Sequence, residues 1–312
     1  MDSIEDSGQR NFLGLSQAYS SEENSYFHIV PVPFDATSTY LAGSRMGPKA
    51  IIDASANLEI YDHTLGLEPA RTGIATHPAL PLRAGDPSGM VLEIERAVES
   101  IVSRGKFPVV LGGEHTVSLG AVRALGARKE FTVVSLDAHA DLRDTYQGTP
   151  YSHACYLRRA SESADCCALG VRSLSAEEAR FAEDAGIKVV FAESLLEQGT
   201  RKVDLGFIPR DIYISIDVDV LDPSIMPATG TPEPGGLGWY DAVGLLERII
   251  SGRRVLGFDV VELCPQPSNP GPDFTAAKLI YRIMGLIIKL SRNRREDGIP
   301  YGKEEVEEET SR

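Results

Sequence analysis

The sequence has 312 residues, of which 42% are hydrophobic and 24% charged, a composition typical of a globular protein long enough to bury a large core. Its formal net charge is −14. Because an acidic chain repels phosphate backbones and attracts cations, this charge argues against nucleic acid as a partner and is compatible with a cationic ligand.

The two ends of the chain differ in composition from the region between them. Residues 1–25 are rich in Ser, Glu, Asn and Gln, and we expect a flexible N-terminal arm there rather than a secretory signal. Residues 296–312 include a run of charged residues and are expected to form a solvated, acidic C-terminal tail. Because no linker composition interrupts residues 26–295, they are predicted to form a single domain.

Short apolar runs predict the strands. The runs are rich in β-branched residues and almost continuously apolar, as expected for strands that are buried on both faces of a parallel sheet. A weaker candidate for an eighth strand covers residues 71–77. The seven clear runs cover residues 27–32, 107–111, 131–136, 166–171, 187–191, 211–216 and 254–260.

Helical patterns lie between and after these runs. Residues 90–104 and 175–186 have apolar residues or caps at helical spacing. Residues 274–290 do too, and the charges of Lys278, Arg282 and Lys289 favour an amphipathic closing helix over a membrane span. Alternating strands and helices predict an α/β fold of three α/β/α layers, with a central, mostly parallel sheet of eight strands.

The cysteines give an expectation about location. Cys155, Cys166, Cys167 and Cys264 show neither CxxC nor zinc-ribbon spacing. Reduced thiols of this kind are typical of a cytoplasmic protein, and we expect that localisation, with no membrane association.

Residues of metal-binding types follow four of the predicted strands. In an open parallel sheet, ligands bind beyond the carboxyl ends of the strands, so side chains placed there share one edge. The residues are His115 after residues 107–111; Asp137, His139 and Asp141 after 131–136; Asp217 and Asp219 after 211–216; and Asp259 and Glu262 after 254–258.

The spacing of these residues predicts a metal site. In extended chain, residues i, i+2 and i+4 point to the same side, so Asp137, His139 and Asp141 can face one point, as can Asp217 and Asp219. Four carboxylates gathered in this way would repel one another, whereas two divalent cations would balance their charge. Oxygen donors combined with imidazole suit Mn²⁺, and two such ions roughly 3.5–4 Å apart can activate a shared water.

Isolated residues of the same types have a simpler interpretation. A single Asp at a strand end is usually a helix N-cap. A single His is usually structural, and we interpret His28, His63 and His77 in this way. Caps do not require the Asp-x-His-x-Asp and Asp-x-Asp patterns at the strand ends, so the metal interpretation is favoured for the set.

These motifs resemble those of the ureohydrolase family, which contains arginases and agmatinases. The resemblance covers roughly residues 28–290, and its most specific parts are the DAHAD and DVDVLDP motifs. The similar segments are PFDATSTYLAGSRMGPKAIIDASANLEIYD (33–62), GGEHTVSLG (112–120), SLDAHADLRD (135–144), SHACYLRR (152–159), SIDVDVLDPSIMPATGTPEPGGL (215–237) and GFDVVELCP (257–265).

The resemblance implies a role for each site residue. It implies that Asp141 and Asp217 are shared between two Mn²⁺ ions per subunit and that Asp141, His153 and Glu262 are catalytic. It also implies that His153, Thr231 and Glu262 bind a small cationic guanidino substrate. Family members form homotrimers or homohexamers, which is the expectation here. The implied metal ligands are His115, Asp137, His139, Asp141, Asp217 and Asp219.

The implied chemistry explains why these groups are needed. A guanidinium is resonance-stabilised and a poor electrophile, so its hydrolysis requires a hydroxide that bridges the two metals. Glu262 is expected to hold the planar guanidinium in a bidentate pair. Asp141 is expected to accept the proton of the hydroxide, and His153 or Asp141 to protonate the leaving amine.

The expected substrate is agmatine, which would be cleaved to putrescine and urea. Residues 144–154 lack the Ser-x-Asn-x-His-Gly pattern with which arginases hold the carboxylate and amine of an amino acid. Two departures from the family pattern are Glu114, where many members have Asp, and Ala228, where many agmatinases have Gly and arginases commonly have Ala. The alternatives are arginine, guanidinobutyrate or formiminoglutamate as the substrate, or a metal-binding regulator without catalysis.

Overall fold

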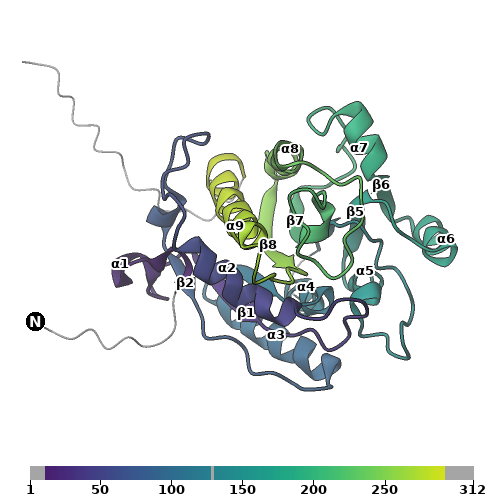
Figure 1. Ribbon diagram of the computed structural model, residues 1–312, viewed down its shortest axis with the longest axis horizontal. Coiled ribbons are helices and arrows are strands. Elements are labelled where there is room, and N and C mark those ends of the chain that lie inside the picture. The colour runs from purple at the N-terminus through teal and green to yellow at the C-terminus, as the bar shows by residue number, and fades with distance from the viewer. Residues whose placement is uncertain (1–10, 128–129, 292–312) are drawn as a thin grey trace, which may run out of the picture.

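Every apolar run that predicted a strand forms one in the computed structural model of the protein, which describes residues 11–127 and 130–291. The strands make a single sheet in which all pairings are parallel (Figure 1). The predicted fold, including the weaker eighth strand, is confirmed. The strands are β1 (Phe27–Val32), β2 (Ile74–Thr76), β3 (Phe107–Gly112), β4 (Thr132–Leu136), β5 (Asp165–Val171), β6 (Lys188–Phe191), β7 (Asp211–Asp217) and β8 (Arg254–Val261).

The order of the strands explains how distant segments meet. The sheet runs β2-β1-β3-β8-β7-β4-β5-β6, so β8 and β7 lie between β3 and β4 although they come much later in the chain. The four central strands β3, β8, β7 and β4 are the ones that the sequence predicted to carry site residues at their carboxyl ends. The change in winding direction between them is where ligands bind in open parallel sheets.

Helices cover both faces of the sheet, and the apolar side chains of each strand alternate between the two resulting cores. Phe27 and Ile29 of β1 pack in one core, whereas Val30 and Val32 pack in the other. The helices of the first face are α2 (Gly47–Ser55), α7 (Ala192–Gln198), α8 (Trp239–Ile250) and α9 (Gly271–Leu290), and those of the second are α3 (Pro87–Ser103), α4 (Ser118–Gly126), α5 (Tyr156–Ala160) and α6 (Ala176–Ala185).

Local signals in the sequence explain where individual helices begin and end. At the start of α6, Ser175 accepts a hydrogen bond from Glu178 N and the Glu178 side chain accepts one from Ser175 N, which is a capping box. The helix ends at Gly186, whose φ of 70° is left-handed. Short 3₁₀ helices complete the chain at η1 (Phe12–Gly14), η2 (Ser44–Met46), η3 (Pro69–Thr72), η4 (His115–Val117), η5 (His153–Cys155) and η6 (Val218–Val220), with a one-turn α1 (Gln17–Ser20).

The closing helix α9 is more deeply buried than an amphipathic helix on the surface would be. It packs against α2 and α8, and its Arg282 is buried in an ion pair with Asp62, 2.6 Å away. Within residues 11–127 and 130–291, no helix is both long and apolar enough to cross a membrane.

Part of the expected N-terminal arm belongs to the folded domain. Phe12 is fully buried, Phe12 N donates a hydrogen bond to Thr76 Oγ1, and Leu13 N donates one to Ser55 Oγ. The polar composition of residues 1–25 hid these two apolar anchors, so the prediction of a flexible arm is wrong for residues 11–25. Residues 1–10 and the expected tail at 296–312 lie outside the described residues.

Candidate metal centre

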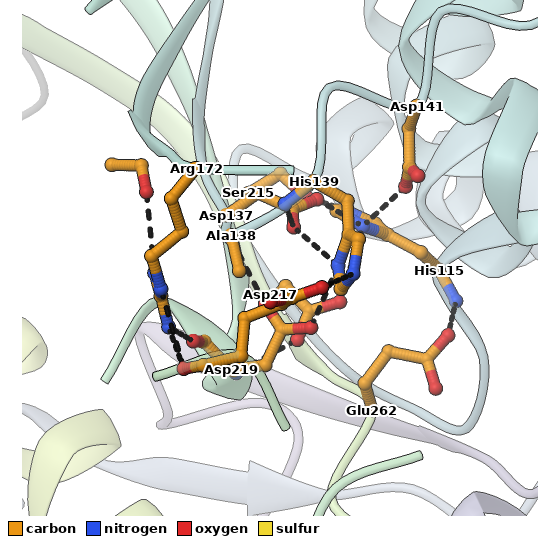
Figure 2. Close-up of polar contacts among 12 residues, drawn as sticks. His115, Asp137, Ala138, His139, Asp141, Arg172, Ser215, Asp217, Asp219 and Glu262 are labelled. Carbon is orange, nitrogen blue, oxygen red and sulfur yellow. Dashed lines mark hydrogen bonds and ion pairs between the residues drawn. The ribbon is translucent and has the colours of Figure 1, made fainter. Parts of the chain in front are cut away.

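The predicted site residues meet at the carboxyl ends of the four central strands. Figure 2 shows His115, beyond β3, surrounded by carboxylates that come from the segments beyond β4 and β7, with Glu262 from the end of β8 beneath it. The structure brings together all six predicted ligands: His115, Asp137, His139, Asp141, Asp217 and Asp219.

The first ligand group surrounds the Nδ1 atom of His115. This atom lies 3.0 Å from Asp137 Oδ2, 3.1 Å from Asp141 Oδ2 and 3.6 Å from Asp217 Oδ2. All four side chains are almost completely buried. His115, Asp137 and Asp141 are therefore placed so that one ion could contact all three.

The second group surrounds His139, whose Nδ1 lies 2.9 Å from Asp219 Oδ2 and 3.6 Å from Asp137 Oδ1. Asp137 thus belongs to both groups and turns one oxygen toward each imidazole. This differs from the expectation that Asp141 and Asp217 are the shared carboxylates. Asp217 Oδ1 instead accepts a hydrogen bond from Asp219 N, 2.8 Å away.

Two buried atoms show that the groups suit a cation. His115 Nδ1 and Asp137 Oδ2 face each other at 3.0 Å, yet neither has a hydrogen-bond partner among the described residues. Buried polar atoms are normally paired, so a pair of ligand atoms left without partners is the arrangement expected around a metal ion. Carboxylates with imidazoles, and no thiolate, form a donor set for a hard divalent cation such as Mn²⁺.

The electrostatics of the carboxylates lead to the same conclusion. Burial, together with the charge of Asp137, raises the pKa of Asp141 to about 7. Burial and the neighbouring Asp219 raise the pKa of Asp217 well above its usual range. Burial opposes protonation of His115, but Asp137 and Asp141 outweigh it and raise the pKa of its imidazole. Protons and metal ions therefore compete for these ligands, and metal binding would release protons.

A polar network behind His115 fixes which nitrogen faces the carboxylates. Ser215 Oγ donates a hydrogen bond to Asp259 Oδ1 at 2.7 Å, so it accepts one from His115 Nε2 at 2.9 Å. Tyr213 OH donates to the other oxygen of Asp259 at 2.6 Å. His115 Nδ1 is left with a lone pair, as a metal ligand requires.

Two members of this network were not predicted, and the third was misplaced. Asp259 was expected at the site edge with Glu262, but it lies inside β8 and supports His115 from behind. Tyr213 and Ser215 were missed. They alternate with apolar residues on the same side of β7 as Asp217, which is the signal that could have identified them.

Glu262 occupies a strained position at the end of β8. Its φ is 66°, and that of Asp141 is 51°, both in the left-handed region that non-glycine residues seldom adopt. Glu262 Oε1 accepts a hydrogen bond from His115 N at 2.7 Å. Glu262 Oε1, one of the two oxygens expected to hold the guanidinium, therefore already accepts one hydrogen bond, although it keeps a second lone pair.

Gly113 allows the chain to turn tightly between β3 and His115. A Cβ atom at this position would lie 2.0 Å from Phe34 O, a distance that no side chain can adopt. Gly113 N donates to Val32 O, and Glu114 N donates to Phe34 O at 2.7 Å. The segment that carries His115 is thereby held against the loop that follows β1.

A cavity of about 250 Å³ opens above the ligands. His139, Asp141, Asp217 and Glu262 contribute to its lining, and the predicted substrate residues His153 and Thr231 lie in its wall. The rest of the wall includes loop residues Ser38–Leu41, Arg143, Tyr146, Leu174 and Glu178. Burial lowers the pKa of His153 to about 4, so its imidazole is neutral at physiological pH.

Arg172 supports the second ligand group and was not predicted. Its guanidinium donates hydrogen bonds to the main-chain oxygens of Asp219 at 2.6 Å, Glu233 at 2.9 Å and Pro234 at 3.1 Å (Figure 2). These bonds connect the start and the end of the loop that follows β7. Asp219 is therefore held in place from behind, as His115 is.

A third group, Glu22, His28 and His77, has ligand-type atoms close together at the edge of the sheet. Its closest contact is a direct ring-to-ring hydrogen bond between His28 Nδ1 and His77 Nε2 at 2.9 Å, and Glu22 also pairs with Arg104 at 3.0 Å. These contacts explain the group as a structural polar cluster, in agreement with the interpretation of the two isolated histidines.

Known proteins resemble this chain in sequence and in structure. The chain is 37% identical over 294 residues to the N(1)-aminopropylagmatine ureohydrolase of Synechocystis sp., which covers 89% of this chain and 94% of the relative. It is 38% identical over 262 residues to the agmatinase of Pyrococcus horikoshii, with 83% and 90% covered. The solved structure of agmatine ureohydrolase from Thermoplasma volcanium superposes with a TM-score of 0.83 at 32% identity, covering 92% of this chain and 97% of that chain.

The arginase family matches residues 25–285, a range that contains every site residue described above. The ligand groups, the pocket and the relatives all agree with this match, so the chain belongs to the arginase family and is an agmatinase-like ureohydrolase.

Proposed function

We propose that this protein is an agmatinase, which hydrolyses agmatine to putrescine and urea with two Mn²⁺ ions per subunit. The observation that supports this most strongly is that Asp137 joins two ligand groups beneath one pocket, with Glu262 beside them. Two cations held side by side can act on the same water molecule. The names of the relatives, agmatinase and N(1)-aminopropylagmatine ureohydrolase, support a guanidino compound as the substrate.

The donor atoms fit such a pair of ions. His115, Asp137 and Asp141 would hold one ion, with Asp217 facing it, and Asp137, His139 and Asp219 would hold the other. When bound, the two ions supply the positive charge that makes water acidic enough to attack as hydroxide at neutral pH.

The chain itself orients the guanidinium. Glu262 lies in the cavity with Oε1 bonded to His115 N, so Oε2 and the remaining lone pair of Oε1 can accept guanidinium N–H groups. This contact would place the guanidinium carbon over the ligand groups, which is the positioning that catalysis requires. The buried Asp141 can hold the proton released from water, and the neutral His153 in the wall can take up a proton and then pass it to the leaving amine.

The wall of the cavity favours a substrate tail without a carboxylate. Arg143 is the one Lys or Arg side chain among the described residues that line it. Its guanidinium already lies 3.8 Å from the carboxylate of Glu178 and over the ring of Tyr146. A carboxylate on the substrate would have to compete with Glu178 for this charge, whereas agmatine has none.

A longer substrate is the second candidate. The Synechocystis relative is named for N(1)-aminopropylagmatine, which has the same guanidinium end and an additional aminopropyl group. Beyond the ligands, the wall includes the exposed Tyr40 and Leu41, where a longer tail could continue toward solvent. The two candidates share their chemistry and differ in the recognition of the tail.

Urea release tests both proposals. Purified protein with Mn²⁺ would be incubated with agmatine, N(1)-aminopropylagmatine, arginine and guanidinobutyrate, with a chelator-treated control for each. The expected result is Mn²⁺-dependent urea release with the highest kcat/KM for agmatine. A higher kcat/KM for N(1)-aminopropylagmatine would support the second candidate, and urea from arginine alone would overturn both. No product from any of these compounds, or from formiminoglutamate, would favour a non-catalytic regulator.

We also propose that the protein is a cytoplasmic homotrimer or homohexamer, with one catalytic domain per subunit that includes residues 11–25. Light scattering of the purified full chain would give the mass of the assembly, and a monomer would contradict this proposal.

A further inference from the structure

Thr37 connects two site residues that are far apart in the sequence. Thr37 Oγ1 lies 2.7 Å from Glu114 Oε1, and Thr37 N donates to Glu114 Oε2 at 2.5 Å. On its other side, Thr37 Oγ1 accepts a hydrogen bond from His153 N at 3.2 Å and lies 3.4 Å from His153 Nδ1. The three residues form a continuous chain of contacts from the segment that carries His115 to the pocket wall.

The single proton of the Thr37 hydroxyl decides the direction of these bonds. Burial raises the pKa of Glu114 to about 7, whereas the two hydrogen bonds that Thr37 donates to its oxygens favour the ionised form. As a carboxylate, Glu114 only accepts hydrogen bonds, and it attracts the hydroxyl proton more strongly than a neutral imidazole does. The distances agree, because Thr37 Oγ1 lies 2.7 Å from Glu114 Oε1 but 3.4 Å from His153 Nδ1. Once its proton is directed to Glu114, Thr37 Oγ1 can only accept from His153, so its contact with Nδ1 requires a hydrogen on that nitrogen. Ser152 Oγ, at 3.5 Å, is the more distant of the two hydroxyls beside Nδ1.

We propose that Glu114, acting through Thr37, is a positioning residue that holds His153 in the Nδ1-protonated tautomer and leaves the Nε2 lone pair free for the substrate. The part of this inference that concerns the substrate rests on the proposed function. The part that concerns the tautomer does not.

The surroundings of the three residues hold this arrangement rigidly. Glu114 is fully buried, and its main-chain N–H donates to Phe34 O, which fixes the start of its side chain relative to the loop that carries Thr37. Tyr146 packs edge-on against His153, with ring centroids 5.9 Å apart. Among the described residues, no hydrogen bond engages His153 Nε2, and His153 lies in the wall of the cavity.

The tautomer has a chemical consequence. A neutral His153 with a free Nε2 can accept a hydrogen bond or a proton from the substrate, but it cannot donate from that atom until it has taken up a proton. In the opposite tautomer, Nε2–H would point its hydrogen at a cationic guanidinium or ammonium, which repels it. Glu114 and Thr37 would thus ensure that His153 begins each cycle as an acceptor.

The tautomer can be measured directly, without a substrate. Long-range ¹H–¹⁵N spectra of the full chain, with ¹⁵N-labelled histidine and diamagnetic Mg²⁺ in place of Mn²⁺, distinguish Nδ1–H from Nε2–H. The His153 signals would be identified by their loss in His153→Gln. We expect Nδ1–H in the wild type and in Thr37→Ser, and a shift toward Nε2–H in Thr37→Val and Glu114→Gln. Nε2–H in the wild type, or an unchanged tautomer in both disruptive variants, would overturn the inference.

Kinetics provide the second readout. Thr37→Val should lower kcat about tenfold and change KM less than about twofold, because the orientation of a proton-transfer group is lost while the guanidinium contact of Glu262 remains. Thr37→Ser should restore kcat to within about twofold, because it keeps the hydroxyl. If urea release is absent for every substrate but the tautomer changes as expected, the proposed function fails and the positioning role stands.

Thr72→Val is the matched control for these variants. Thr72 is buried, and its hydroxyl donates to Pro69 O at 2.8 Å in a region outside the site. This change removes a buried threonine hydroxyl of similar structural value and should leave both kcat and the His153 tautomer unchanged. If Thr72→Val lowered kcat as much as Thr37→Val does, the effect of Thr37 would be one of general stability, and the inference would be wrong.

Discussion

Asp137 differs from the other site carboxylates because its two oxygens face two different imidazoles. Oδ2 lies 3.0 Å from His115 Nδ1, and Oδ1 lies 3.6 Å from His139 Nδ1. By contrast, Asp141 contacts the His115 group and Asp219 contacts the His139 group. The number of ions lost on substitution should therefore differ among the three residues.

We predict that Asp137→Ala binds neither metal ion tightly, whereas Asp141→Ala and Asp219→Ala each lose one. Elemental analysis of dialysed protein would give the manganese content per chain. Glu262→Gln is the matched control, because it lies beside the ligands but belongs to neither group, and it should keep both ions while kcat/KM falls by about 10²-fold or more. One ion retained by Asp137→Ala would show that Asp137 is not the shared ligand.

At the scale of secondary structure, β7 carries the site on one of its faces. Tyr213, Ser215 and Asp217 alternate along this face, so the strand delivers a ligand at its end and supports His115 from its middle. The acceptor for both hydroxyls is Asp259 of the neighbouring strand β8. The affinity of the site for metal should therefore depend on residues that cannot reach the ion.

Ser215→Ala should weaken manganese binding by about 10–100-fold, because His115 loses the acceptor that fixes its tautomer. Competition with a chelator of known affinity would measure this change. Ser135→Ala is a suitable control, since Ser135 is buried at the same level of the adjacent strand β4 and pairs in register with Ser215. Equal manganese affinity in Ser215→Ala and the wild type would contradict the role of the network.

The polar cluster of Glu22, His28 and His77 at the edge of the sheet contains a histidine whose protonation affects folding. Burial lowers the pKa of His28 to about 4, and the charge of His77 adds to this effect. Glu22, Arg104 and Lys106 are the other charged groups that face the pair. In the unfolded chain the histidine titrates near its ordinary pKa of about 6.5.

Stability should therefore fall as the pH decreases from about 6.5 to about 4, because the unfolded state then binds a proton that the folded state excludes. Allowing for solvent screening, the loss attributable to His28 is about 2 kcal/mol. Thermal unfolding of the wild type and His28→Leu across this range would test it, with the exposed His63→Leu as the control. The wild-type curve should drop more steeply than that of His28→Leu, and parallel curves would refute the assignment.

Considered as a whole, the molecule shows which features a sequence can predict. The strands and most ligands could be predicted because each depends on a local pattern, such as an apolar run followed by Asp-x-His-x-Asp. The contacts of Ser215 with Asp259, and of Thr37 with Glu114, depend on which strands and loops become neighbours. No local pattern contains the insertion of β8 and β7 between β3 and β4.

The ligand geometry shows the same limit. Alternation along extended chain predicted that Asp137, His139 and Asp141 face one point, but β4 ends at Leu136 and Asp141 has a φ of 51°. The three side chains converge because the backbone turns after the strand, not because it continues straight. Such a turn depends on the surrounding packing, which holds Asp141 and Glu262 in sparsely populated conformations.

The concentration of buried carboxylates at one edge has a cost for the stability of the whole protein. Burial and the neighbouring Asp219 raise the pKa of Asp217 well above that of an unfolded Asp, so ionising Asp217 costs more free energy in the metal-free folded state than in the unfolded state. A bound cation removes this penalty and stabilises the folded state further by mass action. The carboxylates that the metal site requires therefore destabilise the folded protein until the metal is bound.

We predict that Asp217→Asn raises the Tm of the metal-free protein by a few degrees and abolishes most of the increase that Mn²⁺ gives the wild type. The first effect follows because the substitution removes a buried like charge, and the second because it removes a carboxylate that faces the first ligand group. Calorimetry with and without Mn²⁺ would measure both. Asp222→Asn provides a control of opposite sign, because Asp222 accepts hydrogen bonds from Ser224 N, Gly235 N and Gly236 N, which hold its pKa low, and its loss should lower the Tm with or without metal. A metal-free Asp217→Asn protein less stable than the wild type would mean that the site carboxylates are compatible with one another without a cation, which would weaken the case for a metal centre.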